Sequence, residues 1–143
     1  MGGYFGVITY DINGVQTSLY SILNLNRVAV SADSTHFIAS TETNKFLYGS
    51  WNNTYTYYTT NYTTCDTDYS ADGQFFVLSA SNGRVLLYNA SNSNLLKEIS
   101  TGNAGGIYGA RLTSDSRYLL AVAAASGQIY LYYRSDYYYL NCT

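Results

Sequence analysis

The residues best suited to chemistry are three aspartates that recur at a fixed place in the chain, Asp33, Asp72 and Asp115. Each lies in a Ser/Thr-x-Asp-Ser/Gly tetrapeptide. Paired carboxylates serve as general acids and bases, but Asp and Ser in such a turn hydrogen-bond the neighbouring backbone. Because the aspartates recur once in every repeat of the chain, we interpret all three as structural turn residues rather than as catalytic groups.

The other reactive groups are isolated from one another. His36 is the only histidine, and a metal centre needs several converging His, Cys or carboxylate ligands. Asp66 and Asp68 share one strand face, which favours weak cation binding at most. The glycine-rich stretch 102–106 has no following helix to hold a phosphate, and no Gly-x-Ser-x-Gly motif occurs. The sequence predicts no catalytic centre, no cofactor and no metal site, so we expect that the protein is not an enzyme.

The composition favours a folded, all-β chain. Of the 143 residues 47% are apolar and 18 are tyrosines, with no proline; Tyr, Thr and Val favour strands, and Ser, Asn and Gly favour turns. Charged residues make up 11% and the net charge is −2, which argues against nucleic-acid binding. No apolar run approaches the roughly 20 residues of a membrane span, and the start at Met1 lacks the pattern of a signal peptide.

A repeating unit must position these residues. After each turn aspartate come an apolar run, a second turn and an alternating strand. The apolar runs are 36–39, 75–78 and 118–121; the alternating strands are 46–48, 85–88 and 129–132, with a fourth copy at 7–11 before an Asn13-Gly14 turn. Aligning Tyr10, Gly49, Tyr88 and Tyr132 gives spacings of 39, 39 and 44 residues. This period is close to the roughly 40–45 residues of a four-stranded propeller blade.

We letter the strands of a blade a to d, from the central channel outward. Residues 3–23 supply strands c and d of a first blade, and 26–62, 64–101 and 105–143 form the second, third and fourth blades. The third c strand, Val85-Leu86-Leu87-Tyr88-Asn89, resembles the Ile-x-Leu-Trp-Asp end of a WD repeat. The Gly-His and Trp-Asp dipeptides are absent, so the resemblance implies WD-like blades without the buried Asp-His-Ser-Trp network of that family.

The expected fold is therefore all-β, a single domain or fragment over 1–143 with about three and a half propeller blades in an incomplete ring. A β-sandwich of repeated hairpins is the alternative. Closed propellers have about 4 to 8 blades, and a half blade leaves an open sheet edge. We expect the chain to be completed in one of three ways: as a piece of a longer propeller, as half of a seven-bladed ring of two copies, or as a unit of a filament.

The two cysteines map to distant strands. Cys65 enters an inner strand of the third blade and Cys142 ends the outermost strand of the fourth, which places them beyond the roughly 7 Å Cα separation that a disulfide spans. A disulfide between subunits remains open. Two buried, reduced thiols are the alternative.

Four sequons occur, at Asn52, Asn61, Asn89 and Asn141. All four map to the c–d turns and outer strands, where a glycan would have room. If these asparagines carry N-linked glycans, the protein is extracellular or lies at the cell surface. In a cytoplasmic protein the sequons would be accidental.

Tyrosines are dense in the outer strands. We expect a contact surface from Tyr55, Tyr57, Tyr58, Tyr137, Tyr138 and Tyr139, because exposed Tyr offers a large, rigid, amphipathic area. Packing between adjacent blades is the alternative.

Three functions remain open. The first is a structural or interaction protein that self-associates, as an extracellular glycosylated fibre or sheath. The second is a carbohydrate-binding propeller, and the third is an intracellular WD-repeat scaffold. A fold alone does not choose among them.

Overall fold

The computed structural model describes residues 6–10, 13–21, 24–51, 54–123, 125–135 and 138–142. In 6–10, 17–21, 134–135 and 138–142 it describes the backbone alone. The described chain is all-β, with fourteen strands and no helix, so it holds no helix long and apolar enough to cross a membrane. The predicted fold class is confirmed.

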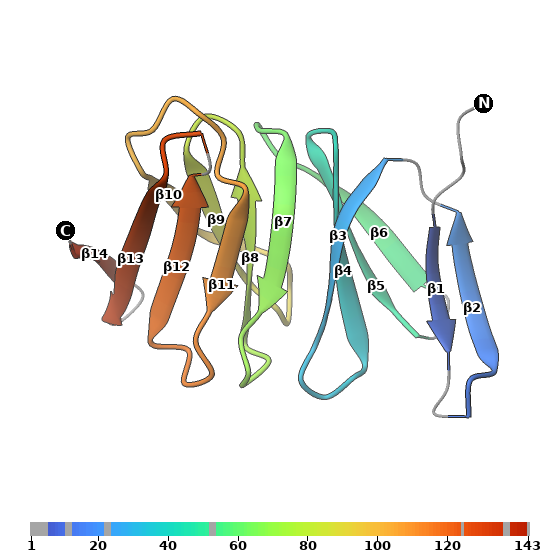
Figure 1. Cartoon of the computed structure of the whole chain (residues 1–143). Helices are drawn as coiled ribbons and strands as arrows, with labels where there is room; N and C mark the ends of the chain where they lie inside the picture. The colour runs from blue at the N-terminus through green and yellow to red at the C-terminus, as the bar shows by residue number, and fades with distance from the viewer. Residues whose placement is uncertain are drawn as a thin grey trace.

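The strands form one two-stranded and three four-stranded antiparallel sheets, each in sequence order (Figure 1). The half blade consists of β1 (Gly6–Tyr10) and β2 (Gln16–Ser21). The second blade consists of β3 (Leu25–Val30), β4 (His36–Thr41), β5 (Lys45–Ser50) and β6 (Thr54–Thr59). The third consists of β7 (Thr64–Tyr69), β8 (Phe75–Ala80), β9 (Arg84–Asn89) and β10 (Leu95–Ser100). The fourth consists of β11 (Gly109–Leu112), β12 (Tyr118–Ala123), β13 (Gln128–Ser135) and β14 (Tyr138–Cys142).

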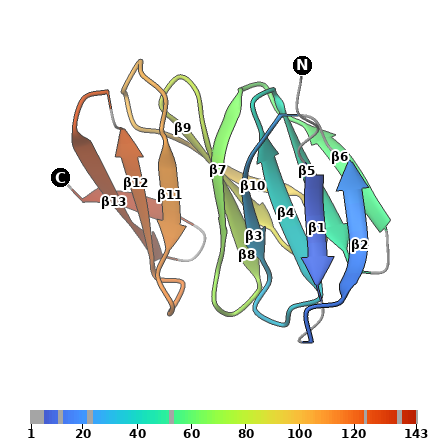
Figure 2. The ribbon, with the colours of Figure 1, turned by 45° about the vertical axis from the view of Figure 1, so that its right-hand side comes forward.

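The blades stack face to face along the sequence, with the half blade at one end and the fourth blade at the other (Figures 1 and 2). The innermost strands β3, β7 and β11 contact one another in succession. Strands β8 and β9 of the third blade lie between two other blades, and all six residues of β8 are buried. A continuous apolar run such as 75–78 is what a strand covered on both faces requires.

Two apolar clusters hold the four-stranded blades together. Between the second and third blades, Phe76 stacks on Tyr88 with ring centroids 4.8 Å apart and meets Phe46 edge-on at 5.7 Å. Between the third and fourth blades, Val77 and Leu119 lie in a second buried cluster. Its other described members are Phe75, Val85, Leu87, Ile99, Ile107, Ala110, Ala121, Ala123 and Tyr132. A lone sheet buries too little apolar surface to offset its chain entropy, so each blade depends on the blades beside it.

The ring is not closed. Among the described strands, substantial contacts between four-stranded sheets join the second blade to the third and the third to the fourth. The half blade consists of β1 and β2 alone. One end of the stack is therefore the two-stranded half blade, while the other end is a complete four-stranded sheet.

Candidate functional site

The three turn aspartates make the same hydrogen bonds in every blade. Asp33 Oδ1 accepts from the Ser31 hydroxyl at 2.6 Å and from the Thr35 N–H at 3.0 Å. Asp72 and Asp115 accept from the hydroxyl two residues earlier and the N–H two residues later at the same distances. The Ser31 hydroxyl and the Thr35 N–H lower the pKa of Asp33 to about 2. These carboxylates make the hydrogen bonds that close the turns between strands a and b.

His36 begins strand β4 and is half-buried. Its Nδ1 lies 2.6 Å from the Thr35 hydroxyl, and its ring stacks on Tyr48 with centroids 5.3 Å apart. It lines a cleft of about 450 Å³ with Asp33 and Gln74. In the part of the chain that the structure describes, no three His, Cys, Asp or Glu side chains come together as metal ligands.

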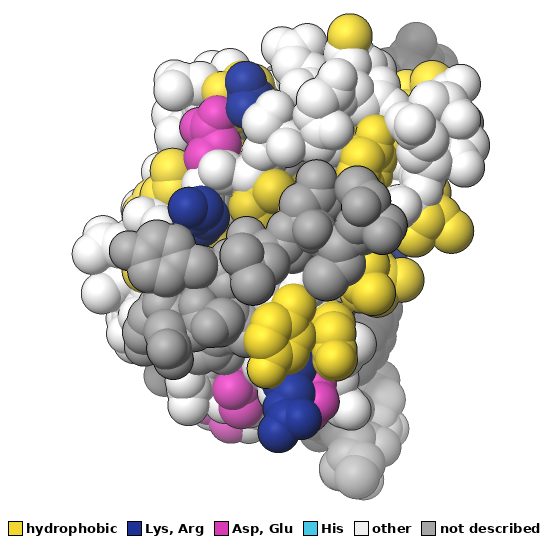
Figure 3. All heavy atoms as spheres, turned by 90° about the vertical axis from the view of Figure 1, so that its left-hand side faces the viewer, with side chains coloured by type: hydrophobic (Ala, Val, Ile, Leu, Met, Phe, Trp, Pro, Cys, Tyr) yellow, Lys and Arg dark blue, Asp and Glu magenta, His cyan; other side chains and the backbone are white. Residues whose placement is uncertain are grey.

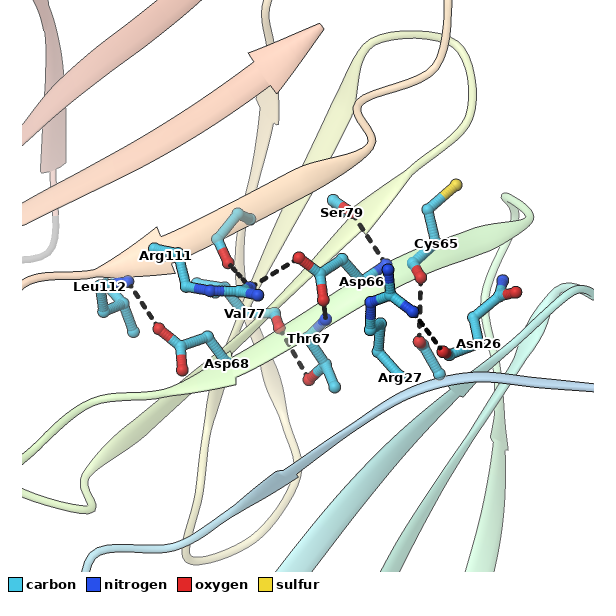
Figure 4. Close-up of polar contacts among 12 residues, drawn as sticks. Asn26, Arg27, Cys65, Asp66, Thr67, Asp68, Val77, Ser79, Arg111 and Leu112 are labelled. Atoms are coloured by element: carbon cyan, nitrogen blue, oxygen red, sulfur yellow. Dashed lines mark hydrogen bonds and ion pairs between the residues drawn. The ribbon is translucent and has the colours of Figure 1, made fainter. Parts of the chain in front are cut away.

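Asp66 and Asp68 bond to residues of the fourth blade rather than facing an open site for a metal ion (Figure 4). Asp66 Oδ2 lies 2.6 Å from Arg111 Nη1, and Asp68 Oδ2 accepts from the Leu112 N–H at 3.0 Å. Burial raises the pKa of Asp68, and the Leu112 N–H and the Arg111 charge oppose that rise. Both carboxylates therefore join β7 to the inner strand β11: Asp66 pairs with the Arg111 side chain, and Asp68 accepts from the Leu112 backbone N–H.

The described sequons lie in different settings. Asn61 is exposed, in the connection from β6 to β7 rather than in a c–d turn or an outer strand, which corrects the predicted position. Asn89 is half-buried at the end of β9, where its Oδ1 accepts from the N–H and the hydroxyl of Ser91 at 2.8 and 2.7 Å. Asn52 lies outside the described residues, and Asn141 lies in β14, of which only the backbone is described.

The cysteines lie on the strands expected from the sequence. Cys65 lies in β7 as a free, half-buried thiol. Burial raises its pKa, so the thiolate that would start disulfide exchange is scarce near neutral pH. Cys142 lies in β14, where only the backbone is described. The disulfide between subunits stays a prediction.

The predicted tyrosine surface divides between two faces of β6. Tyr55 and Tyr57 are each 46% exposed, and their rings meet edge-on at 5.8 Å. Tyr58 points the other way and stacks on the buried Phe46 at 5.1 Å, so it belongs to the contact with the third blade and not to an open surface. Tyr138 and Tyr139 lie in β14 with only the backbone described, and Tyr137 lies outside the described residues.

The free face of the fourth blade carries apolar side chains that the sequence argument missed. Leu120 and Ile129 are 38% and 69% exposed, whereas Val77 and Val85, at the matching positions of the third blade, are 0% exposed. Tyr118, Val122 and Tyr133 lie on the same face and are exposed too. Figure 3 looks onto this end of the molecule and shows apolar side chains at its surface, beside residues drawn in grey. Aligning the third and fourth blades on their turn aspartates identifies these positions from the sequence.

The opposite end of the stack shows the same mismatch. Val28 and Val30 on β3 are 53% and 47% exposed. Their counterparts in the third blade, Thr67 and Tyr69, are buried, and Tyr69 packs in the cluster between the second and third blades. The uncovered positions lie on the inner strand, beside the half blade that has no inner strands of its own.

No protein-family model matches this chain, and no curated protein matches it in sequence. The functional argument therefore depends on the geometry of the blades.

Proposed function

We propose that the chain is a non-catalytic structural protomer that associates with further copies of itself by stacking end blades. The observation that carries the proposal is the free face of the fourth blade. Leu120 and Ile129 stand there at positions that the third blade buries completely as Val77 and Val85. An exposed apolar patch of this kind is typical of an interaction site.

The occupant that we propose is a second copy of the chain. Each internal interface joins one face of a blade to the opposite face of the next. The chain leaves the Leu120 face of the fourth blade uncovered, and at the other end it leaves Val28 and Val30 of the inner strand β3 uncovered. A second copy would continue the stack that the second, third and fourth blades already form. Such a contact is heterologous, so it closes into a ring if the rotation per copy permits and otherwise propagates as a filament.

The charged side chains described around the free face of the fourth blade are paired, so they would not strongly oppose stacking. Around the free face of the fourth blade, Arg111 is held by Asp66 and Arg117 lies 3.7 Å from Asp115. The sequons extend the proposal to an extracellular, glycosylated fibre or sheath. An intracellular scaffold built from the same stack is the alternative, and the mass of the native protein before and after glycosidase treatment distinguishes them.

Sedimentation velocity over a range of protein concentrations tests the association. We expect the wild-type mass to rise above the 15.8 kDa of one chain. Leu120→Lys and Ile129→Lys should weaken association at least about 100-fold, because each would bury an unpaired ammonium group. Leu96→Lys is the matched control, since Leu96 has the same 38% exposure as Leu120 but lies on the outer strand β10.

Circular dichroism establishes that each variant is folded before its mass is compared. A wild-type chain that stays at the mass of one copy at every concentration contradicts the proposal. So does a loss of association by Leu96→Lys as large as that of Leu120→Lys.

A further inference from the structure

A cleft of about 320 Å³ lies where the outer parts of the second and third blades meet. Its walls come from β6 and the connection after it, from β9, and from β10 with the turn before it. The lining includes Tyr58, Asn61, Tyr62, Tyr88, Asn94 and Glu98. Ligand pockets measure about 300–1,000 Å³, so this cleft has room for a ligand of one or two small rings.

The aromatic side of the cleft is held rigid by the core. Phe46 is fully buried; Tyr58 stacks on it at 5.1 Å with an interplanar angle of 11°, and Tyr88 packs on it at 5.1 Å. Tyr88 is in turn stacked on Phe76. These rings are therefore already in place before a ligand arrives, which reduces the entropy cost of binding.

The polar side of the cleft is close to electrically neutral. The Tyr62 hydroxyl donates to Glu98 Oε1 at 2.6 Å, and this hydrogen bond raises the pKa of Tyr62. Arg84 Nε lies 3.5 Å from the same Glu98 oxygen, and the Arg84 guanidinium lies 5.7 Å from the centroid of the Tyr62 ring. The exposed Asn61 and Asn94 add side-chain amides, which both donate and accept hydrogen bonds.

We propose that this cleft binds a neutral saccharide. A sugar ring presents C–H groups on its faces and hydroxyls around its edge. The C–H faces pack well on aromatic side chains. The hydroxyls hydrogen-bond to side-chain amides, which donate and accept, and to a carboxylate, which accepts. The balanced charge of Glu98 and Arg84 favours an uncharged sugar over a phosphorylated or acidic one. This inference does not depend on self-association.

The saccharide has two potential sources. It can be a free sugar, or it can be the first residue of an N-linked glycan on Asn61, which itself lines the cleft and heads the Asn61-Tyr62-Thr63 sequon. Tyr58 precedes Asn61 by three residues and lies in the same cleft. A glycan attached at Asn61 would therefore start at the mouth of the site.

The first arm of the test uses protein made in the bacterial cytoplasm without N-linked glycans. Saturation-transfer NMR is recorded with glucose, galactose, mannose and N-acetylglucosamine, and with glucose 6-phosphate as the charged comparison. We expect at least one neutral sugar to bind, and Tyr62→Ala and Asn94→Ala each to weaken it about tenfold or more. Tyr108→Ala, at an exposed tyrosine in the connection from β10 to β11 and outside the cleft, should leave binding unchanged.

The second arm uses protein secreted from a eukaryotic host. Intact mass is measured before and after peptide N-glycosidase, with Asn61→Gln as the comparison, and nuclear Overhauser effects are sought between the first sugar and the rings of Tyr58 and Tyr62. Free-sugar binding that Asn94→Ala weakens supports the first source. A glycan lost in Asn61→Gln whose first sugar contacts those rings supports the second. The proposal is overturned if folded protein does neither, or if Tyr108→Ala weakens binding as much as Asn94→Ala.

Discussion

Replacing Arg111 with Met tests whether the contact between Asp66 and Arg111 stabilises the third and fourth blades. Arg111 Nη1 lies 2.6 Å from Asp66 Oδ2, and Asp66 is 4% exposed, so the variant leaves a carboxylate oxygen where little water reaches. Leaving a buried polar group unpaired costs about 1–3 kcal/mol, and breaking a wholly buried ion pair costs about 3–5 kcal/mol. Because the Arg111 side chain is 57% exposed, solvent screening brings the expected loss in the free energy of unfolding to about 1–3 kcal/mol.

Urea unfolding followed by circular dichroism measures this loss, together with Asp66→Asn and the double variant. The neutral amide removes the charge that Arg111→Met leaves unpaired, so the two changes should be non-additive by about 1 kcal/mol or more. Arg117→Met is the matched control: Arg117 and Asp115 lie 3.7 Å apart with side chains 68% and 51% exposed, and the loss should stay within about 0.5 kcal/mol. Equal losses for Arg111→Met and Arg117→Met, or an additive double variant, would refute the reasoning.

Two further predictions concern the turns. Gly83 has φ +66°, and a Cβ there would clash with the Asn103 carbonyl oxygen, so Gly83→Ala should lower the free energy of unfolding by about 2–4 kcal/mol. Gly73→Ala, at φ +70° with open space around it, should lower that free energy by only about 1–2 kcal/mol. Equal losses for the two variants in urea unfolding would contradict the clash. The pKa of Asp33 is about 2 in the folded protein and about 3.9 when unfolded, so its stabilisation is present above about pH 4 and is lost as the pH falls toward 2. Asp33→Asn should therefore flatten the pH dependence of the free energy of unfolding in that window. An unchanged slope would count against the turn hydrogen bonds.

The sequence predicts the blades well because the signals for turns and strands are local. The Ser-x-Asp turns close through bonds between residues two apart, such as Asp33 and Thr35. The apolar residues of strand 85–88 and of the run 75–78 predict by themselves that these strands are buried. The Asn82-Gly83 pair, with φ of 57° and 66°, is a turn that only a few residue types adopt.

The contacts between blades are less accessible to sequence reasoning. Arg111 neutralises Asp66 from 45 positions further along the chain, and the relative register of two stacked sheets leaves no local pattern. The different setting of Tyr58 is predictable from the sequence, because strand alternation places it on the face opposite Tyr55 and Tyr57. The exposure of Leu120 depends on whether another blade lies beyond it, and that is a property of the assembly rather than of the residue.

The successive stacking of the blades has a mechanical consequence. Among the described strands, the third sheet makes its substantial contacts with the second and the fourth sheets. Contacts that involve side chains, rather than shared backbone ladders, join these sheets, as with Asp68 and the Leu112 N–H. A pulling force applied to the two ends of such an array would peel off one sheet at a time, starting with an outermost one. Extension under load would then release about forty residues for each four-stranded sheet, and sheets still in place would retain their neighbour contacts.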